Sequence, residues 1–116
     1  MRILMNKYNK RPYSRYCQEA ATLLGMLIQE ARKEKRMTLR DLAERANISR
    51  GTLHKIEHGN LSCELGIVFE VAATVGVSLF AMNEENLSAE LRRAQSKLHL
   101  LPKRIRNNSM DFDDDF

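Results

Sequence analysis

Side chains that donate hydrogen bonds gather on one short stretch of this 116-residue chain, between positions 50 and 58. Leu53 and Ile56 are three residues apart, so a helix over this stretch turns both of them inward. The residues that such a helix leaves facing out are small or basic: Arg50, Gly51, Thr52, His54, Lys55 and His58. Guanidinium, ammonium and imidazole groups bind phosphate oxygens and the acceptor atoms on base edges. The stretch therefore indicates a surface suited to nucleic acid.

Two short helices joined by a tight turn are expected to position this face. Thr38 is a helix N-cap, and Asp41, three residues later, completes a capping box. Asn47 falls at the turn, where an asparagine tolerates a left-handed backbone. Ser49 then caps the second helix, and Gly59 ends it. The pattern is typical of a helix-turn-helix, although an ordinary helical hairpin with a solvated basic face would have the same caps and periodicity.

Further motifs lie on both sides of these two helices. They are Leu24-Gly25-x-x-Ile28, Arg32, Thr38, Leu42-Ala43, Ser49, Thr52-Leu53, Ile56-Glu57, Gly59, Ala72 and the run 76–80. With them, residues from about 23 to 80 resemble the phage-repressor-like (Cro/cI, or XRE) DNA-binding domain. The resemblance implies an all-α fold, a compact bundle of about five helices. It also implies that Arg50, Gly51 and Lys55 face base edges, and it places Ser49, Thr52 and Asn60 near phosphates.

Two positions depart from the pattern of that family. Its members often carry a glutamine directly after the capping threonine, where it contacts a phosphate, but this chain has Leu39 there. Arg40 is the residue that could replace this contact. Gly51 offers no side chain to a base, so the readout is expected to depend on Arg50, His54 and Lys55.

The same resemblance implies a role for Arg32 and Glu57. Members of the family often have a partly buried ion pair at these two positions, which joins the first helix to the recognition helix. We therefore expect a structural pair here. Loss of one partner would leave a buried charge without its counterion, which is strongly destabilising. The alternative is that Arg32 binds a phosphate.

A narrower resemblance covers nearly the whole chain. It is carried by residues 16–36, by Glu64-Leu-Gly-Ile-Val-Phe-Glu-Val-Ala-Ala, by Val75-Gly-Val-Ser-Leu-Phe, by Leu101-Pro-Lys-Arg-Ile-Arg and by the acidic end 113–116. These segments are similar to HipB-like antitoxins, which are encoded beside HipA-type serine/threonine kinase toxins. The resemblance implies such a kinase as a protein partner.

The helix-turn-helix is expected to lie within one domain, residues 13–82. A first helix over 13–35 would bury Ala20, Leu24, Leu27, Ile28 and Ala31, which share one face, and a helix over 63–75 would bury Leu65, Val68, Phe69 and Ala72. Ser78 could cap a short further helix through Met82. The preceding residues, 1–12, are expected to form a flexible basic arm, and contact with the DNA backbone is the alternative.

The C-terminal part is expected to be a helix over 83–101 and a flexible tail over 102–116 that ends in acidic residues. Leu87, Leu91, Ala94 and Leu98 are spaced four, three and four residues apart, which gives a heptad-like seam. We expect this seam to form a homodimer, because operators are usually palindromic, and folding back on its own domain is the alternative. Phe112 and Phe116 lie among carboxylates and could anchor the tail to a partner, or the tail only aids solubility.

Charge and cysteine content restrict the class of protein. Residues 1–60 carry 13 Lys and Arg against 6 Asp and Glu, a net +7, whereas residues 61–116 carry 6 against 9, a net −3. The positive half holds the expected recognition helix, as a surface that faces phosphates requires. Cys17 and Cys63 have no zinc-like spacing, and the three histidines form no ligand set, so no metal and no cofactor are expected. The apolar runs are too short to span a membrane.

These observations favour a transcriptional repressor that binds double-stranded operator DNA as a dimer and is also the antitoxin of a HipA-type kinase module. The expected location is the cytoplasm, at the nucleoid. A free-standing phage-type regulator without a toxin is the first alternative. A pure interaction protein that has lost DNA binding is another, because of Gly51 and the missing glutamine. An enzyme such as a nuclease is disfavoured, since the sequence offers no paired carboxylates, oriented nucleophile or metal ligands.

Overall fold

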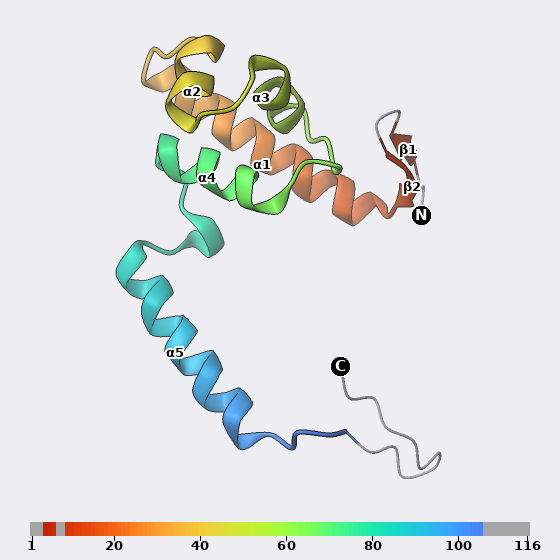
Figure 1. Cartoon of the computed structure of the whole chain (residues 1–116), viewed down its shortest axis with the longest axis vertical. Helices are drawn as coiled ribbons and strands as arrows, with labels where there is room; N and C mark the ends of the chain where they lie inside the picture. Colours follow the sequence, from red (N-terminus) through yellow and green to blue (C-terminus); the bar gives the residue numbers. More distant parts are fainter. Residues whose placement is uncertain (1–3, 7–8, 106–116) are drawn as a thin grey trace. The chain divides into compact units, whose positions relative to one another are not determined.

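Five α-helices carry this all-α fold, which a computed structural model describes over residues 4–6 and 9–105 (Figure 1). They are α1 (Arg15–Glu34), α2 (Leu39–Ala46), α3 (Arg50–Glu57), α4 (Leu65–Val75) and α5 (Glu84–Leu100). The short helix expected after Ser78 is a 3₁₀ turn at Leu79–Ala81. The chain divides after Leu79 into two units, the first with α1 to α4 and the second with α5. The all-α fold predicted from the sequence is confirmed.

A β-hairpin over the described residues 4–6 and 9–13 precedes α1, in the segment that the sequence predicts to be a flexible basic arm. Its strands are β1 (Leu4–Asn6) and β2 (Asn9–Tyr13), which pair antiparallel with Leu4 opposite Tyr13 and Met5 opposite Pro12. A proline argues against a strand because it lacks the N–H donor. Both strands of a two-stranded sheet are edge strands, however, so Pro12 is tolerated here.

The hydrophobic core of the first unit takes side chains from all four of its helices. α1 and α2 each pack on α3 and α4 (Figure 1). The largest fully buried side chains are Ile28, Leu42, Leu53, Val71 and Val75. The predicted inward faces were correct for Ile28, Leu42, Leu53 and Ala72. They were wrong for Ala20, Leu27 and Leu65, which are exposed, the last two at 40% and 67%. α4 is apolar on most sides, so its periodicity does not indicate which side meets the core.

All four helices of the first unit end in the same way. Each is followed by a residue with a left-handed backbone, and these are Arg36, Asn47, Gly59 and Gly76, with φ between 57° and 83°. The next residue donates its N–H to a carbonyl five residues back, in the bonds Met37→Arg32, Ile48→Ala43, Asn60→Lys55 and Val77→Ala72 at 2.8–3.1 Å. This is the Schellman arrangement, in which the residue after the left-handed one turns back onto the helix. Met37, Ile48 and Val77 accordingly pack on the core.

Gly25 lets α1 cross the end of α3 at close range. A Cβ atom at this position would lie 2.6 Å from the carbonyl oxygens of both Ile56 and Glu57. Real Cβ atoms do not approach backbone oxygens so closely, so any side chain here would push the two helices apart. The C-terminal end of α3 is therefore held directly against α1.

α5 is amphipathic along its length. Asn83 caps it by accepting from the N–H of Asn86, and the helix ends at Leu100, shortly before Pro102. Leu87, Leu91 and Leu98 on the predicted seam are 37%, 59% and 69% exposed. Residues 101–105 form neither helix nor strand, and the acidic end of the tail, with Phe112 and Phe116, lies outside the described residues. No helix in the described part of the chain is long and apolar enough to cross a membrane.

Replacing Gly25 with alanine tests the close crossing of α1 and α3. We expect Gly25→Ala to lower the free energy of unfolding by about 1–3 kcal/mol, because the new methyl group overpacks against backbone. The measurement is urea denaturation followed by circular dichroism. Gly66→Ala is the matched control, since a Cβ at Gly66 meets nothing within 4 Å. That variant should be as stable as the parent or up to about 1 kcal/mol more stable, and equal stability of both variants would contradict the crossing.

Candidate nucleic-acid interface

The first helix of the candidate interface, α2, begins at a complete capping box. Thr38 Oγ1 accepts from the N–H of Asp41 at 3.0 Å, and the Asp41 carboxylate accepts from the N–H of Thr38 at 2.9 Å. These hydrogen bonds hold the pKa of Asp41 below its usual range, with the backbone N–H of Thr38 as the largest cause. The box sets the starting direction of α2 and with it the turn that leads to α3.

The turn itself is short and held by local bonds. Asn47 has φ 58° and ψ 47°, and Ser49 is the N-cap of α3. Ser49 Oγ accepts from the N–H of Thr52 at 3.0 Å and donates to Thr52 Oγ1 at 2.9 Å. These bonds keep Ser49 and Thr52 together at the start of α3, where the free N–H groups and the helix dipole favour an anion.

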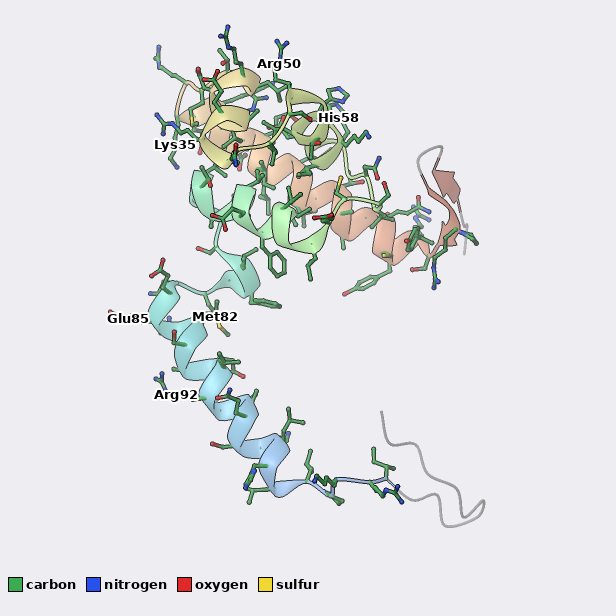
Figure 2. The ribbon with its side chains drawn as sticks, viewed as in Figure 1. Lys35, Arg50, His58, Met82, Glu85 and Arg92 are labelled. Atoms are coloured by element: carbon green, nitrogen blue, oxygen red, sulfur yellow. The ribbon has the colours of Figure 1, made fainter. Side chains whose placement is uncertain are left out.

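The outer face of α3 holds the donor side chains that the sequence singled out. Arg50, His54 and His58 are exposed, and Figure 2 shows Arg50 and His58 projecting from the surface. Thr52 and Lys55 are half-buried. The His54 and His58 rings stack with centroids 4.0 Å apart, and His58 Nδ1 lies 2.8 Å from the carbonyl oxygen of His54. That contact leaves Nε2 of His58 as the nitrogen available to an outside group.

Arg40 and Arg50 come together at one hollow on this surface. The hollow lies between α2 and the turn, and its walls are Arg40, Ala43, Glu44, Ile48 and Arg50. Arg40 Nε donates to Glu44 Oε2 at 3.4 Å, in a pair with both side chains largely exposed. Two guanidinium groups from different helices thus border one site, which suits a phosphate better than either group alone.

Gly51 is exposed in the first turn of α3. A Cβ atom there would meet only Ser49 Oγ, at 3.8 Å. The fold therefore does not require a glycine at this position, although glycine is the least favourable residue in a helix apart from proline. The missing side chain leaves the backbone of α3 uncovered beside Arg50.

Asn60 does not fit the phosphate contact expected from the sequence. Its Oδ1 accepts from the N–H of Ser62 at 2.7 Å, and also from the Ser62 hydroxyl. Its Nδ2 is shielded from solvent and has no hydrogen-bond partner among the described residues. The physical reason is its place in the helix end: Asn60 follows the left-handed Gly59, as Met37, Ile48 and Val77 follow theirs, and this position turns the side chain inward. The resulting hollow is apolar, with Leu24, Cys63, Val68 and Phe69 among its walls.

Arg32 and Glu57 meet beneath the recognition helix. Arg32 donates from Nε to Glu57 Oε2 at 2.7 Å, from Nη2 to Glu57 Oε1 at 3.0 Å, and from Nη1 to the carbonyl oxygen of Met37 at 3.0 Å. Arg32 is 8% and Glu57 3% exposed. The hydrogen bonds to Glu57 raise the pKa of Arg32, against the opposing effect of burial. Arg32 is therefore turned inward, which argues against the alternative that it binds a phosphate.

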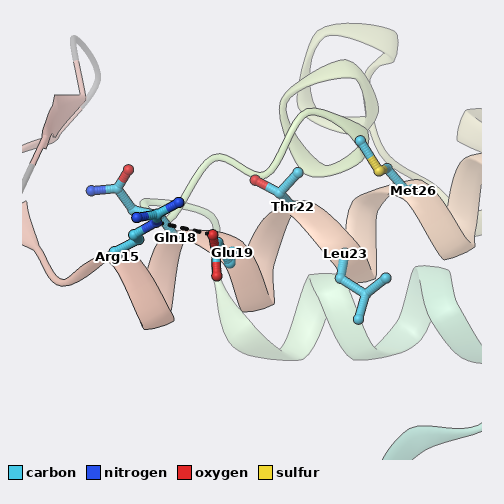
Figure 3. Close-up of a pocket in the computed structure, with 6 residues that line it drawn as sticks. All are labelled: Arg15, Gln18, Glu19, Thr22, Leu23 and Met26. Carbon is cyan, nitrogen blue, oxygen red and sulfur yellow. Dashed lines mark hydrogen bonds and ion pairs between the residues drawn. The ribbon is translucent and has the colours of Figure 1, made fainter. Parts of the chain in front are cut away.

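Two further features of the described residues lie outside α2 and α3, a hollow along α1 and the thiol of Cys63. Figure 3 shows the residues that line a hollow along the exposed side of α1. Arg15 Nε and Glu19 Oε2 pair there at 3.2 Å, and Leu23 and Met26 line the hollow further along the helix. Burial raises the pKa of the Cys63 thiol, which disfavours the reactive thiolate form. Within the described part of the chain, no three His, Cys, Asp or Glu side chains lie close enough to hold a metal ion.

Comparison with known proteins agrees with this geometry. Residues 28–80, from the middle of α1 to the 3₁₀ turn, match a family model described as Helix-turn-helix. That family is one of DNA-binding domains and not of enzymes. No curated protein and no solved structure matches the chain.

A double-mutant cycle on Arg32 and Glu57 tests whether they stabilise the domain as a pair. We expect Arg32→Met and Glu57→Met each to lower the free energy of unfolding by about 3–5 kcal/mol, because each leaves one buried charge unpaired. The double variant should lose clearly less than the sum of the two, since no lone charge remains. The measurement is urea denaturation. The exposed pair Arg40 and Glu44 is the control, and its coupling free energy should be below about 1 kcal/mol. Losses at Arg32 and Glu57 that simply add would contradict a paired role.

Proposed function

We propose that this chain, whose residues 28–80 match a family model described as Helix-turn-helix, is a sequence-specific transcriptional repressor that binds palindromic operator DNA. The observation that carries the proposal is the outer face of α3. This face begins at the capped start of α3 and exposes Arg50 and His54. It also borders the hollow that Arg50 shares with Arg40. In this fold such a face enters the major groove.

The proposed roles follow from the position of each side chain. Arg50 is the first residue of α3 and binds a guanine edge through two hydrogen bonds, a contact that discriminates against other bases by about 1–3 kcal/mol. His54 and Lys55, further along the helix, contact neighbouring bases or the backbone. Ser49 and Thr52 at the start of α3, Arg40 in α2 and His58 at the far end contact phosphates. Phosphate contacts supply much of the affinity and make it dependent on salt.

The protein works as a homodimer in this proposal. One small domain buries little DNA, whereas two recognition helices in successive major grooves read a palindrome about 34–36 Å apart. Leu87, Leu91, Ala94 and Leu98 on α5 are the residues proposed for the subunit contact. α5 supports this role because its leucines remain exposed in the single chain.

The finer proposal is that the repressor is the antitoxin of a HipA-type serine/threonine kinase and represses its own operon from the nucleoid in the cytoplasm. It rests on the resemblance of residues 16–36, 64–73 and 101–106 to HipB-like antitoxins. The kinase would bind away from α3, so that DNA and toxin are held together. A free-standing phage-type regulator is the alternative, and the absence of a kinase-like gene next to this one would favour it.

Titration of DNA from the gene's own upstream region tests the proposed function. We expect the wild type to bind this DNA tightly, with an affinity that falls as the salt concentration rises. The double variant Arg50→Ala, Lys55→Ala should bind about 100-fold more weakly or worse, since each lost contact costs about 1–3 kcal/mol. Fluorescence anisotropy at two salt concentrations measures this. Lys33→Ala with Arg92→Ala removes the same charge outside α2 and α3 and is the control. Equal affinity of both double variants would contradict readout by α3, and no binding by the wild type would favour a pure interaction protein.

Gly51 gives a second test, in which stability and DNA binding should change in opposite directions. Gly51→Ala adds a methyl group that meets only Ser49 Oγ, at an ordinary contact distance of 3.8 Å, so the thermal stability should stay equal or rise. Operator affinity should fall by about tenfold, because overpacking a close contact costs about 1–3 kcal/mol. Gly66→Ala, also at the second position of a helix and in open space, is the matched control and should leave the affinity unchanged. Unchanged affinity of Gly51→Ala would show that DNA does not approach this part of α3 closely.

A further inference from the structure

The subunit contact has an orientation that the residues of α5 determine. We propose that α5 pairs with α5 of a second copy in antiparallel orientation, about a two-fold axis between residues 92 and 93. The inference rests on the proposed dimer and adds its geometry. Two arguments support it, one from side-chain volume and one from charge.

The volume argument concerns the seam, which runs from Leu87 to Leu98 along about 16 Å of helix. In a parallel pair each seam residue faces its own copy, so Ala94 would face Ala94 and leave a gap in the middle of the seam. In the antiparallel pair Leu91 faces Ala94 of the other copy, and Leu87 faces Leu98. Every layer then contains at least one leucine, which fills the seam evenly. The exposed fractions of 37%, 59% and 69% at Leu87, Leu91 and Leu98 show that this surface is open to a partner.

The charge argument concerns the residues beside the seam. Glu90 and Lys97 flank it on one side, seven residues apart, and Ser88 and Gln95 flank it on the other. The antiparallel register places Glu90 across from Lys97 of the other copy, and symmetry repeats this pair. In a parallel pair Glu90 would instead lie across from Gln95, with no ion pair. Glu90 also accepts two hydrogen bonds from Arg93 of its own helix. Both of these hydrogen bonds go to Oε2, so Oε1 is the oxygen proposed to meet Lys97 of the other copy.

The opposite side of α5 provides the controls. Figure 2 shows Glu85 and Arg92 on one side of the helix, and their spacing of seven residues agrees with this. At about 100° per residue this side lies far from the seam. Charge changes at Glu85 and Arg92 therefore alter the net charge without altering the proposed contact.

Charge reversal in the full-length chain tests the orientation, with sedimentation equilibrium as the measurement. Glu90→Lys and Lys97→Glu should each weaken self-association by about tenfold, because two attractive pairs become repulsive. An equimolar mixture of the two variants should associate as heterodimers about as well as the wild type, since one chain then has two lysines where the other has two glutamates. The doubly reversed chain should also recover. Glu85→Lys and Arg92→Glu should leave the association unchanged.

Several outcomes would overturn the antiparallel pair. They are a wild type that stays monomeric, single reversals no weaker than their controls, and a mixture that fails to recover. Circular dichroism checks that each variant keeps its helix content, which exposed substitutions should not change. The operator titration separates this proposal from the proposed function. A wild type that is monomeric but binds DNA contradicts only the antiparallel pair. A mixture of the two variants that regains association, with a wild type that does not bind DNA, contradicts only the repressor.

Discussion

The guanidinium of Arg32 joins three separate segments beneath the recognition surface. Its hydrogen bonds reach Glu57 at the end of α3 and the carbonyl of Met37 in the link between α1 and α2, while Arg32 itself belongs to the last turn of α1. A buried pair of this kind is costly to desolvate, so it contributes less to net stability than its short distances suggest. Its main effect is to fix the orientation of α3, because any rotation of α3 about its axis would separate two buried charges. The Gly25 crossing acts at the same place, since it brings the backbone of α1 against Ile56 and Glu57. The inner side of α3 is thus held by contacts that leave its outer side open.

The helix ends show how local chemistry supplies this arrangement. Four left-handed residues end four helices, and only two of them are glycines. The left-handed backbone is unfavourable in conformational energy for Arg36 and Asn47. It is offset because the following residues, Met37 and Ile48, then pack on the core. Asn60 occupies the equivalent position after α3 with a polar side chain, and its amide nitrogen is left without a partner among the described residues. The same backbone arrangement therefore ends all four helices, and at the end of α3 it also leaves one side-chain donor without a partner among the described residues.

The two units divide the work in the proposed function. The first presents α3, with Arg40 and Arg50 at one hollow, and residues 1–60, which include this surface, have a net charge of +7. The second presents a helix whose seam leucines are exposed, from 37% at Leu87 to 69% at Leu98. DNA recognition and self-association would then use different surfaces, and each can be altered without the other.

The features that could be predicted from the sequence are those that depend on neighbours within about five residues. Thr38, Asp41, Asn47 and Ser49 indicated the capping box, the turn and the start of α3, and the leucine spacing indicated α5. The resemblance to XRE proteins added the pairing of Arg32 with Glu57. Only the tertiary structure decided which side of α1 and α4 meets the core, because Leu27 and Leu65 are as apolar as the residues that are buried. It alone brought Arg40 beside Arg50, turned the Asn60 amide inward and paired the strands of the hairpin. The reason is that caps and turns are satisfied by adjacent backbone, whereas burial and shared sites depend on distant segments that no local pattern specifies.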